Sequence, residues 1–159
     1  MDIKKKLSSF ALNSLAKRML TKKEVSEKLQ RLSKKLEENA EILKEHQVII
    51  QDIINELEEK KLLNDEFYVQ TYLNYELETN FRGKWGYWEK LMKKGIEKEL
   101  FEKTWQELNP NEEKLAKKLL ENNSFRFSQE KDEYKRKAKI QRFLQGRGFS
   151  FEAMNTISI

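Results

Sequence analysis

Residues 91–96 read Leu-Met-Lys-Lys-Gly-Ile, and residues 144–149 read Leu-Gln-Gly-Arg-Gly-Phe. Each stretch has a leucine, a glycine four residues later and then a large apolar residue. Glycine readily takes the left-handed conformation that ends many helices, so each stretch predicts a helix C-terminus followed by a packed residue. Gly95 and Gly148 lie 53 residues apart, and three units of that length would fill the chain of 159 residues. The pair therefore indicates an internal repeat.

The spacing of apolar residues around these stretches is helical. Val25, Leu29, Leu32 and Leu36 recur at steps of three and four, which places them on one helix face. Together with the apolar stripe at 49–57, Leu29 is interpreted as part of a third, stretched copy of the repeat. One proline and five glycines cannot supply the frequent turns of a β-sandwich or barrel. We therefore expect an all-α protein of about eight to ten helices, given the usual helix length.

Two motifs predict where long helices begin. Thr21 and Glu24 form a capping box, in which two side chains satisfy two amides of the first helical turn. Asn109 precedes Pro110 and Glu112, so we expect Asn109 to cap a helix that has proline at its first position.

Other residues are expected to separate helices. Residues 64–65, Asn-Asp, lie where one helix stops and the next starts, and Gly83 and Gly86 are expected to interrupt the chain. A polar loop that contains Arg126 and the phenylalanines beside it is expected before the apolar stripe that begins at Ile140. Ser150 is expected to cap a last short helix that ends near Ile157.

The composition excludes several functional classes. The chain has no cysteine, which excludes disulfides, thiolate nucleophiles and thiolate zinc sites. Its one histidine, His46, lies in a charged segment and is expected to be solvated or to cap a helix, so we expect no catalytic, metal or cofactor site and no enzyme activity. No apolar run exceeds three residues, so we expect no membrane span or signal peptide and a cytoplasmic protein.

Charge is distributed unevenly along the chain. Residues 1–35 carry a net charge of +8, residues 36–80 carry −9 and residues 81–159 carry +6. Two basic ends around an acidic middle favour a partner of negative or mixed charge. The alternative interpretation is that these residues form ordinary solvated helix faces.

The candidate contact residues lie in these basic ends. Arg136, Lys139 and Arg142 can share one helix face at their spacing. The full set of basic candidates is Arg18, Lys22, Lys23, Lys135, Arg136, Lys137, Lys139, Arg142 and Arg147.

Aromatic residues beside basic residues add further candidates. Trp85 lies next to Lys84, and Arg126 lies between phenylalanines at 125 and 127. Alternating aromatic and basic residues can bind a single nucleic-acid strand, and Trp85 can stack on a base or on a partner. The alternatives are core or loop packing for Trp85 and packing between repeats for the phenylalanines. Two other tryptophans are expected in the core: Trp88 and Trp105.

Three segments resemble one known family, RecX. Residues 139–150, Lys-Ile-Gln-Arg-Phe-Leu-Gln-Gly-Arg-Gly-Phe-Ser, are similar to its C-terminal signature. Residues 62–67, Leu-Leu-Asn-Asp-Glu-Phe, followed by the 91–96 stretch, resemble its central motif. Residues 11–29 resemble its opening motif, whereas the Lys/Glu-rich stretch at about 31–45 lengthens the first repeat beyond the family pattern.

The resemblance implies a fold and a function. It implies three tandem three-helix modules, at 1–63, 64–109 and 110–159, in an elongated, curved array. It also implies a monomeric regulator of RecA, commonly an inhibitor, that binds the groove of the RecA–DNA filament and limits strand exchange, ATPase and co-protease activity during DNA recombination and the SOS response. Expected partners are the RecA filament and single-stranded DNA, with double-stranded DNA as a further option. The alternatives are a helical repeat protein that acts directly on DNA and a helical adaptor for another protein.

Overall fold

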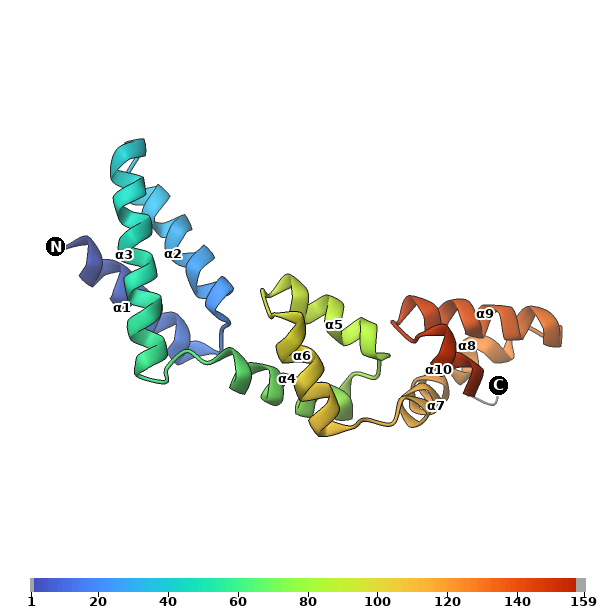
Figure 1. Ribbon diagram of the computed structural model, residues 1–159. Coiled ribbons are helices and arrows are strands. Elements are labelled where there is room, and N and C mark those ends of the chain that lie inside the picture. Colours follow the sequence, from blue (N-terminus) through green and yellow to red (C-terminus); the bar gives the residue numbers. More distant parts are fainter. Residues whose placement is uncertain (1, 157–159) are drawn as a thin grey trace. The chain divides into compact units, whose positions relative to one another are not determined.

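The computed structural model describes residues 2–156 of the chain. Within these residues it contains ten helices and no strand, which confirms the all-α prediction (Figure 1). The helices are α1 (Ile3–Lys17), α2 (Lys22–Leu36), α3 (Ala40–Glu59), α4 (Asp65–Thr79), α5 (Lys84–Lys93), α6 (Lys98–Leu108), α7 (Glu112–Asn122), α8 (Ser124–Ser128), α9 (Glu133–Gly146) and α10 (Phe151–Thr156). Ile157, expected at the end of the last helix, lies outside the described residues.

The helices pack into two compact units. The first contains the chain up to Tyr68 together with Lys94–Ile96, and the second contains Val69–Lys93 and the chain from Glu97 onward. In the first unit, α1, α2 and α3 pack against one another in pairs (Figure 1). In the second, α5 packs on α6, α8 packs on α9, and α10 packs on both α7 and α9.

The core of the first unit comes from the predicted apolar stripes. Val25 and Leu29 of α2 are buried, and the stripe of α3 is buried from Ile50 to Leu57. The charged stretch at 31–45 forms no separate insertion there. It continues α2 to Leu36 and begins α3 after a short turn, with Asn39 capping α3 through bonds from the amides of Glu41 and Ile42.

His46 was expected to be solvated or to cap a helix, and that expectation is wrong. Its side chain is 7% exposed and its Nδ1 lies 2.7 Å from Oγ of the buried Ser33. The two residues join α2 to α3 by a polar contact in an otherwise apolar interface. Its charged sequence neighbours lie on other faces of the helix, which is why they did not reveal its burial.

An aromatic cluster forms part of the core of the second unit. Phe101 lies between Trp88, at 5.3 Å between ring centroids, and Trp105, at 5.8 Å. Tyr87 completes the cluster at 5.9 Å from Trp105. Trp105 is buried as predicted, whereas Trp88 is half-buried.

Helix starts follow the predicted caps in two cases out of three. Thr21 and Glu24 form the capping box, and Ser150 accepts a bond from the amide of Ala153 at the start of α10. The prediction for Asn109 is wrong, because α7 begins two residues later and Asn111 caps it. Asn109 instead ends α6 in the left-handed conformation, with φ at 44°.

Two expected breaks in the chain are helical. Gly86 lies inside α5, in its first turn, rather than in a loop. The polar loop expected around Arg126 contains the short helix α8, which carries both phenylalanines of that segment. Phe127 is buried, and Phe125 is 78% exposed.

Gly95 and Gly148 have the predicted left-handed backbone, with φ of +82° and +89°. At the second glycine the hydrogen bonds that close a helix are present. The amide of Phe149 donates to Leu144 O, and the amide of Gly148 donates to Gln145 O, each at 3.1 Å. Both bonds satisfy carbonyls that the end of α9 would leave without partners.

Candidate functional site

The two glycine turns each pack against the N-terminus of an earlier helix. In the first unit, Thr21 Oγ1 donates to Lys94 O at 2.6 Å, directly before Gly95. A methyl group on Gly95 would overlap the side chain of Lys23 at the start of α2. The carboxylate of Asp65, the first residue of α4, accepts from the amide of Lys22 at 2.9 Å. We call this arrangement the first joint.

The second unit contains the same arrangement, which we call the second joint. The amide of Gly83 donates to Arg147 O at 2.9 Å, and the amide of Trp85 donates to Gly148 O at 3.1 Å. The carboxylate of Glu112, the first residue of α7, accepts from the amide of Lys84 at 3.4 Å. In both joints a carboxylate accepts from an amide at a helix start, which also carries partial positive charge. The glycine turn accepts from the Thr21 hydroxyl in the first joint and from two backbone amides in the second.

Lys84 and Trp85 therefore hold structural positions in the second joint. Lys84 Nζ lies 2.8 Å from Glu102 Oε2 in a half-buried ion pair, and 5.1 Å from the centre of the Trp85 ring. Lys98 lies 5.8 Å from the same ring. Trp85 remains 41% exposed, but the ammonium groups of Lys84 and Lys98 lie close to its ring.

Three of the predicted basic residues lie in the first unit. Arg18 pairs with Glu24 at 3.3 Å, and the two lysines that follow Thr21 pair with Glu58 at 3.3 Å and Glu27 at 3.8 Å. All three basic side chains are about half exposed. Exposed pairs of this kind contribute little to stability, so these cations can exchange their partners readily.

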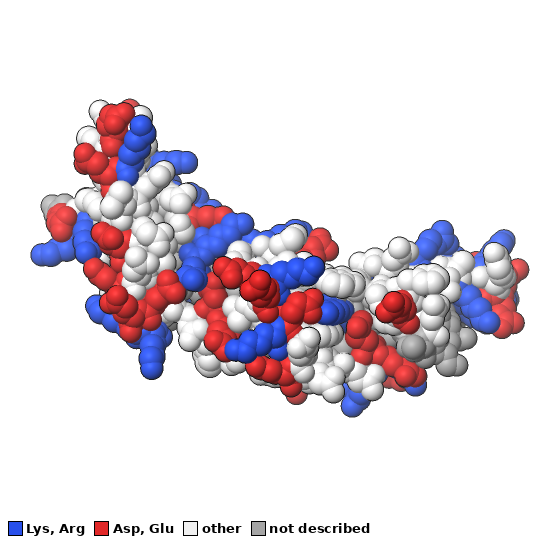
Figure 2. Space-filling view, in the orientation of Figure 1, with Lys and Arg blue, Asp and Glu red and all other residues white. Residues whose placement is uncertain are grey.

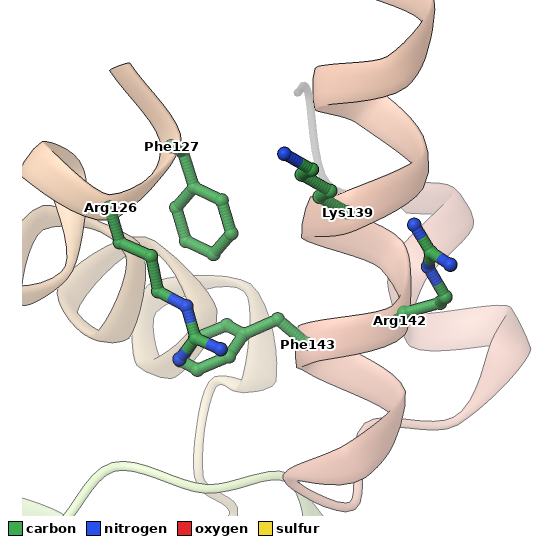
Figure 3. Close-up of a pocket in the computed structure, with 5 residues that line it drawn as sticks. All are labelled: Arg126, Phe127, Lys139, Arg142 and Phe143. Carbon is green, nitrogen blue, oxygen red and sulfur yellow. The ribbon is translucent and has the colours of Figure 1, made fainter. Parts of the chain in front are cut away.

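Three of the other basic candidates line a pocket of the second unit. The pocket has a volume of about 470 Å³ and lies between α8 and α9 (Figure 3). Its lining comprises Arg126 and Phe127 from α8, and Lys139, Arg142 and Phe143 from α9. Three of these five residues are cations and none is a carboxylate, so the pocket favours an anionic ligand. We call it the basic pocket.

Phe143 organises this pocket. Its ring lies 5.1 Å from the guanidinium carbon of Arg126 and 5.0 Å from that of Arg147, and the ring of Phe127 meets it edge-on at 5.2 Å. Contacts between a cation and an aromatic ring at an exposed site contribute about 0.5–1 kcal/mol each. Phe143 thus holds two guanidinium groups near fixed positions. The sequence marked it only as one member of an apolar stripe. Arg147 follows it at the i, i+4 spacing that brings side chains together on a helix, whereas Arg126 comes from a different helix.

Glu130 lies beside the pocket and binds two of the predicted cations. Its Oε2 lies 3.0 Å from Lys139 Nζ, and its backbone carbonyl accepts from Arg136 at 3.2 Å. Its Oε1 accepts from the amide of Asp132 at 3.2 Å. The bond from Lys139, and then that from Asp132, hold the pKa of the Glu130 carboxyl below its ordinary value. Lys139 therefore faces the pocket with a carboxylate already bound.

The structure brings together some of the predicted residues and separates others. Arg126, Lys139 and Arg142 line the basic pocket, and Arg147 reaches its central ring. Lys137 instead pairs with Glu133 one turn earlier on α9, at 3.6 Å, and Lys135 is exposed near the start of that helix. Figure 2 shows Lys and Arg side chains over the α9 region, with uncharged surface and some Asp or Glu side chains among them.

Metal centres and membrane spans are two other kinds of site that a helical chain can carry. Among residues 2–156, no group of three or more histidine, aspartate or glutamate side chains is arranged to hold a metal ion. Over the same residues, every helix is too short or too polar to cross a bilayer.

The chain is similar to proteins of one family along its whole length. A family sequence profile described as "RecX, third three-helix domain" matches residues 111–157. The regulatory protein RecX of Streptococcus uberis is 32% identical over 124 residues, which are 73% of this chain and 45% of that protein. RecX of Clostridium perfringens strain 13 is 30% identical over 157 residues, which are 96% of this chain and 66% of that protein. The chain thus spans between about half and two thirds of these relatives' lengths.

Solved structures of RecX proteins are also similar to this chain over nearly its whole length. The crystal structure of RecX from Lactobacillus salivarius matches with a TM-score of 0.77 and 27% identity, over 98% of this chain and 94% of that one. A second crystal structure, of regulatory protein RecX, matches with a TM-score of 0.80 and 25% identity, over 98% of this chain and 71% of that one. With its sequence relatives, its domain match and its fold in agreement, the chain belongs to the RecX family.

Proposed function

We propose that this protein inhibits the RecA recombinase by binding in the groove of the RecA–DNA filament, where it limits strand exchange, ATPase and co-protease activity. Membership of a family whose relatives are named regulatory proteins carries the proposal. The similarity to a RecX crystal structure over 98% of this chain supports it, because the whole described fold takes part in the match.

The proposal includes the division into three modules, at 1–63, 64–109 and 110–159. The two joints support this division. The first connects α2, in the first module, to the Gly95 turn and Asp65 in the second. The second connects α5, in the second module, to the Gly148 turn and Glu112 in the third. Repeating one joint is how a repeat protein stacks units that are too small to fold alone.

The charges of the chain support the approach to such a filament. A DNA-containing filament presents phosphates and charged protein surface, and complementary charges mainly raise the association rate and select orientation. The proposed contact residues are those of the basic pocket together with Arg18, Lys22 and Lys23, and the protein is expected to act as a monomer.

The test is the ATPase activity of RecA on single-stranded DNA, measured over a dilution series of this protein. We expect a dose-dependent loss at amounts well below one molecule per RecA protomer. An unchanged rate at equimolar protein would overturn the proposal.

A second ATPase that depends on single-stranded DNA, such as a helicase, provides the control. Inhibition of RecA alone supports regulation of the filament. A parallel loss with both enzymes would show that the protein acts by covering DNA, and an effect on neither would favour the adaptor alternative.

A further inference from the structure

We propose that α9 carries a binding site for a single nucleic-acid strand, with Arg142 between two hollows and Glu130 as a built-in competitor for Lys139. This inference deepens the proposed function by giving the expected single strand a defined place on α9. It does not depend on RecA, so the two proposals can fail separately.

Arg142 takes part in two hollows on different faces of α9. One is the basic pocket, towards α8. The other has a volume of about 380 Å³ and lies between α9 and α10, where Phe151 and Met154 form part of its wall. Its complete lining is Ala138, Gln141, Arg142, Gln145, Phe151, Met154 and Asn155. A ligand that extends from one hollow to the other must pass the Arg142 guanidinium.

The charges of this surface select an anion. Neither hollow is lined by a carboxylate, whereas cations stand in the first and at the boundary between them. The Arg126 guanidinium carbon lies 5.1 Å from the centre of the Phe143 ring, a contact that favours this position of the group before a ligand arrives. A planar guanidinium with fixed donors suits phosphate oxygens, which it can bind in pairs.

Exposed aromatic rings favour a nucleic-acid strand over an acidic peptide. Phe151 is 74% exposed at the edge of the second hollow, and Phe125 is 78% exposed on the helix that forms the first. An acidic peptide needs only the cations, whereas nucleobases also need flat apolar surfaces on which to stack. The bases of a duplex are already stacked on one another, so the arrangement suits a single strand.

The ion pair between Glu130 and Lys139 must break when a phosphate binds to the Lys139 ammonium. The 3.0 Å ion pair occupies the Lys139 ammonium in the free protein. A phosphate in the basic pocket would compete with that carboxylate for the same donor. Removing the negative charge of Glu130 should therefore strengthen binding more than removing that of Glu133, which pairs with Lys137 outside both hollows.

The experiment measures fluorescence anisotropy of a labelled oligo-dT with the full chain, without RecA, over a range of salt concentrations. We expect Arg142→Ala to weaken binding on the order of ten-fold and to reduce the salt slope by about 0.7, the value for one phosphate contact on a single strand. Lys137→Ala is the matched control, because it removes one charge from the same helix but outside both hollows. It should change affinity by less than about two-fold.

Two further variants test the parts of the site. Phe151→Ala should weaken binding of the oligonucleotide on the order of ten-fold while leaving binding of an abasic strand of the same length unchanged. Glu130→Gln should tighten binding on the order of three- to ten-fold at low salt, whereas the control Glu133→Gln should change it by less than about two-fold. Circular dichroism of each variant shows that the helices are retained.

Each of the following results would contradict one part of the proposed strand-binding site. Equal losses for Arg142→Ala and Lys137→Ala would overturn the site, because the attraction would then belong to the general surface charge. Equal binding of the normal and abasic strands, or full competition by poly-glutamate at equal charge, would overturn the assignment of a nucleic-acid strand as the ligand. An acidic protein segment would then be the favoured ligand. Equal effects of Glu130→Gln and Glu133→Gln would overturn the competitor role.

Discussion

A methyl group on Gly148 would overlap the backbone nitrogen of Gly86, because the turn after α9 packs directly on the first turn of α5. The contact is between two backbones, without a side chain from either residue. A methyl group on Gly86 would in turn overlap the carbonyl of Arg147. A glycine inside a helix lowers helix stability by about 0.5–1 kcal/mol relative to alanine, so its presence in α5 is explained by this close approach.

Replacing Gly148 should therefore destabilise the second unit strongly. Gly148→Val places a branched side chain at φ +89° and against the backbone of α5, and the left-handed conformation alone costs roughly 1–2 kcal/mol. We expect a lower melting temperature by circular dichroism.

Gly146, two residues earlier, provides the matched control. It is the last residue of α9, and a methyl group there would meet no neighbouring atom within 4 Å beyond its own stretch of helix. Gly146→Ala should be neutral or stabilising by about 0.5 kcal/mol. Equal melting temperatures for Gly148→Val and the wild type would contradict the close packing of the Gly148 backbone on α5 in the second joint.

Lys61 holds a left-handed position that suits glycine better. Its φ is 59°, and the amides of Lys61 and Leu62 donate to Glu58 O and Leu57 O at the end of α3, as at Gly148. Lys61→Gly removes the Cβ strain but adds freedom to the unfolded chain, so we expect a net gain of about 0.5–1 kcal/mol in urea unfolding. Asn109→Gly should gain less, because asparagine tolerates this conformation. Destabilisation by Lys61→Gly would show that the lysine side chain supports the turn.

Ser33 and His46 form a polar pair that should lose stability when only one partner is removed. Ser33→Ala leaves the buried Nδ1 of His46 without its 2.7 Å partner, which costs about 1–3 kcal/mol of unfolding free energy. The double variant Ser33→Ala/His46→Leu should recover part of that loss, because both polar groups are then absent. Additive losses in the double variant, measured by urea unfolding, would indicate that the pair is not coupled.

Glu112 should make stability depend on pH in an unusual direction for a carboxylate. Burial raises the pKa of its carboxyl, and the hydrogen bond from the Lys84 amide and the charge of Lys84 oppose the shift. A raised pKa means that the folded state holds the proton more tightly than the unfolded state. This contribution to stability is present at low pH and is lost as the pH rises through the raised value.

Glu112→Gln removes this titration and keeps an oxygen that can accept from the Lys84 amide. We expect the wild type to lose stability relative to this variant as the pH rises from about 4 towards neutrality. Shifts at other residues, such as the lowered pKa of Glu56 beside Lys4, are common to both proteins and cancel in the difference. Urea unfolding at a series of pH values measures this difference in unfolding free energy. Glu113→Gln, in the same helical turn, is the control. Parallel profiles for the wild type and Glu112→Gln would contradict the half-buried position of the Glu112 carboxylate.

Candidate residues that share one helix could be recognised before the structure, and their companions on other elements could not. Lys139 and Arg142 are three residues apart on α9, a spacing that places them near each other on any helix. Arg126 joins them only because α8 packs on α9. Glu130, which binds Lys139, was not a candidate, because nothing local distinguishes it from the many other glutamates of the chain.

By itself, the sequence determined the all-α fold, the helix starts at Thr21 and Ser150, and the turns at Gly95 and Gly148. These features depend on residues within about one helical turn of one another, where spacing and backbone conformation act directly. Only the tertiary structure decided that Phe143 would contact Arg126, that His46 would meet Ser33, and that Asp65 and Glu112 would cap helices far away in the chain. Those contacts form when packed helices bring distant segments within hydrogen-bonding or van der Waals reach, and no local pattern encodes that approach.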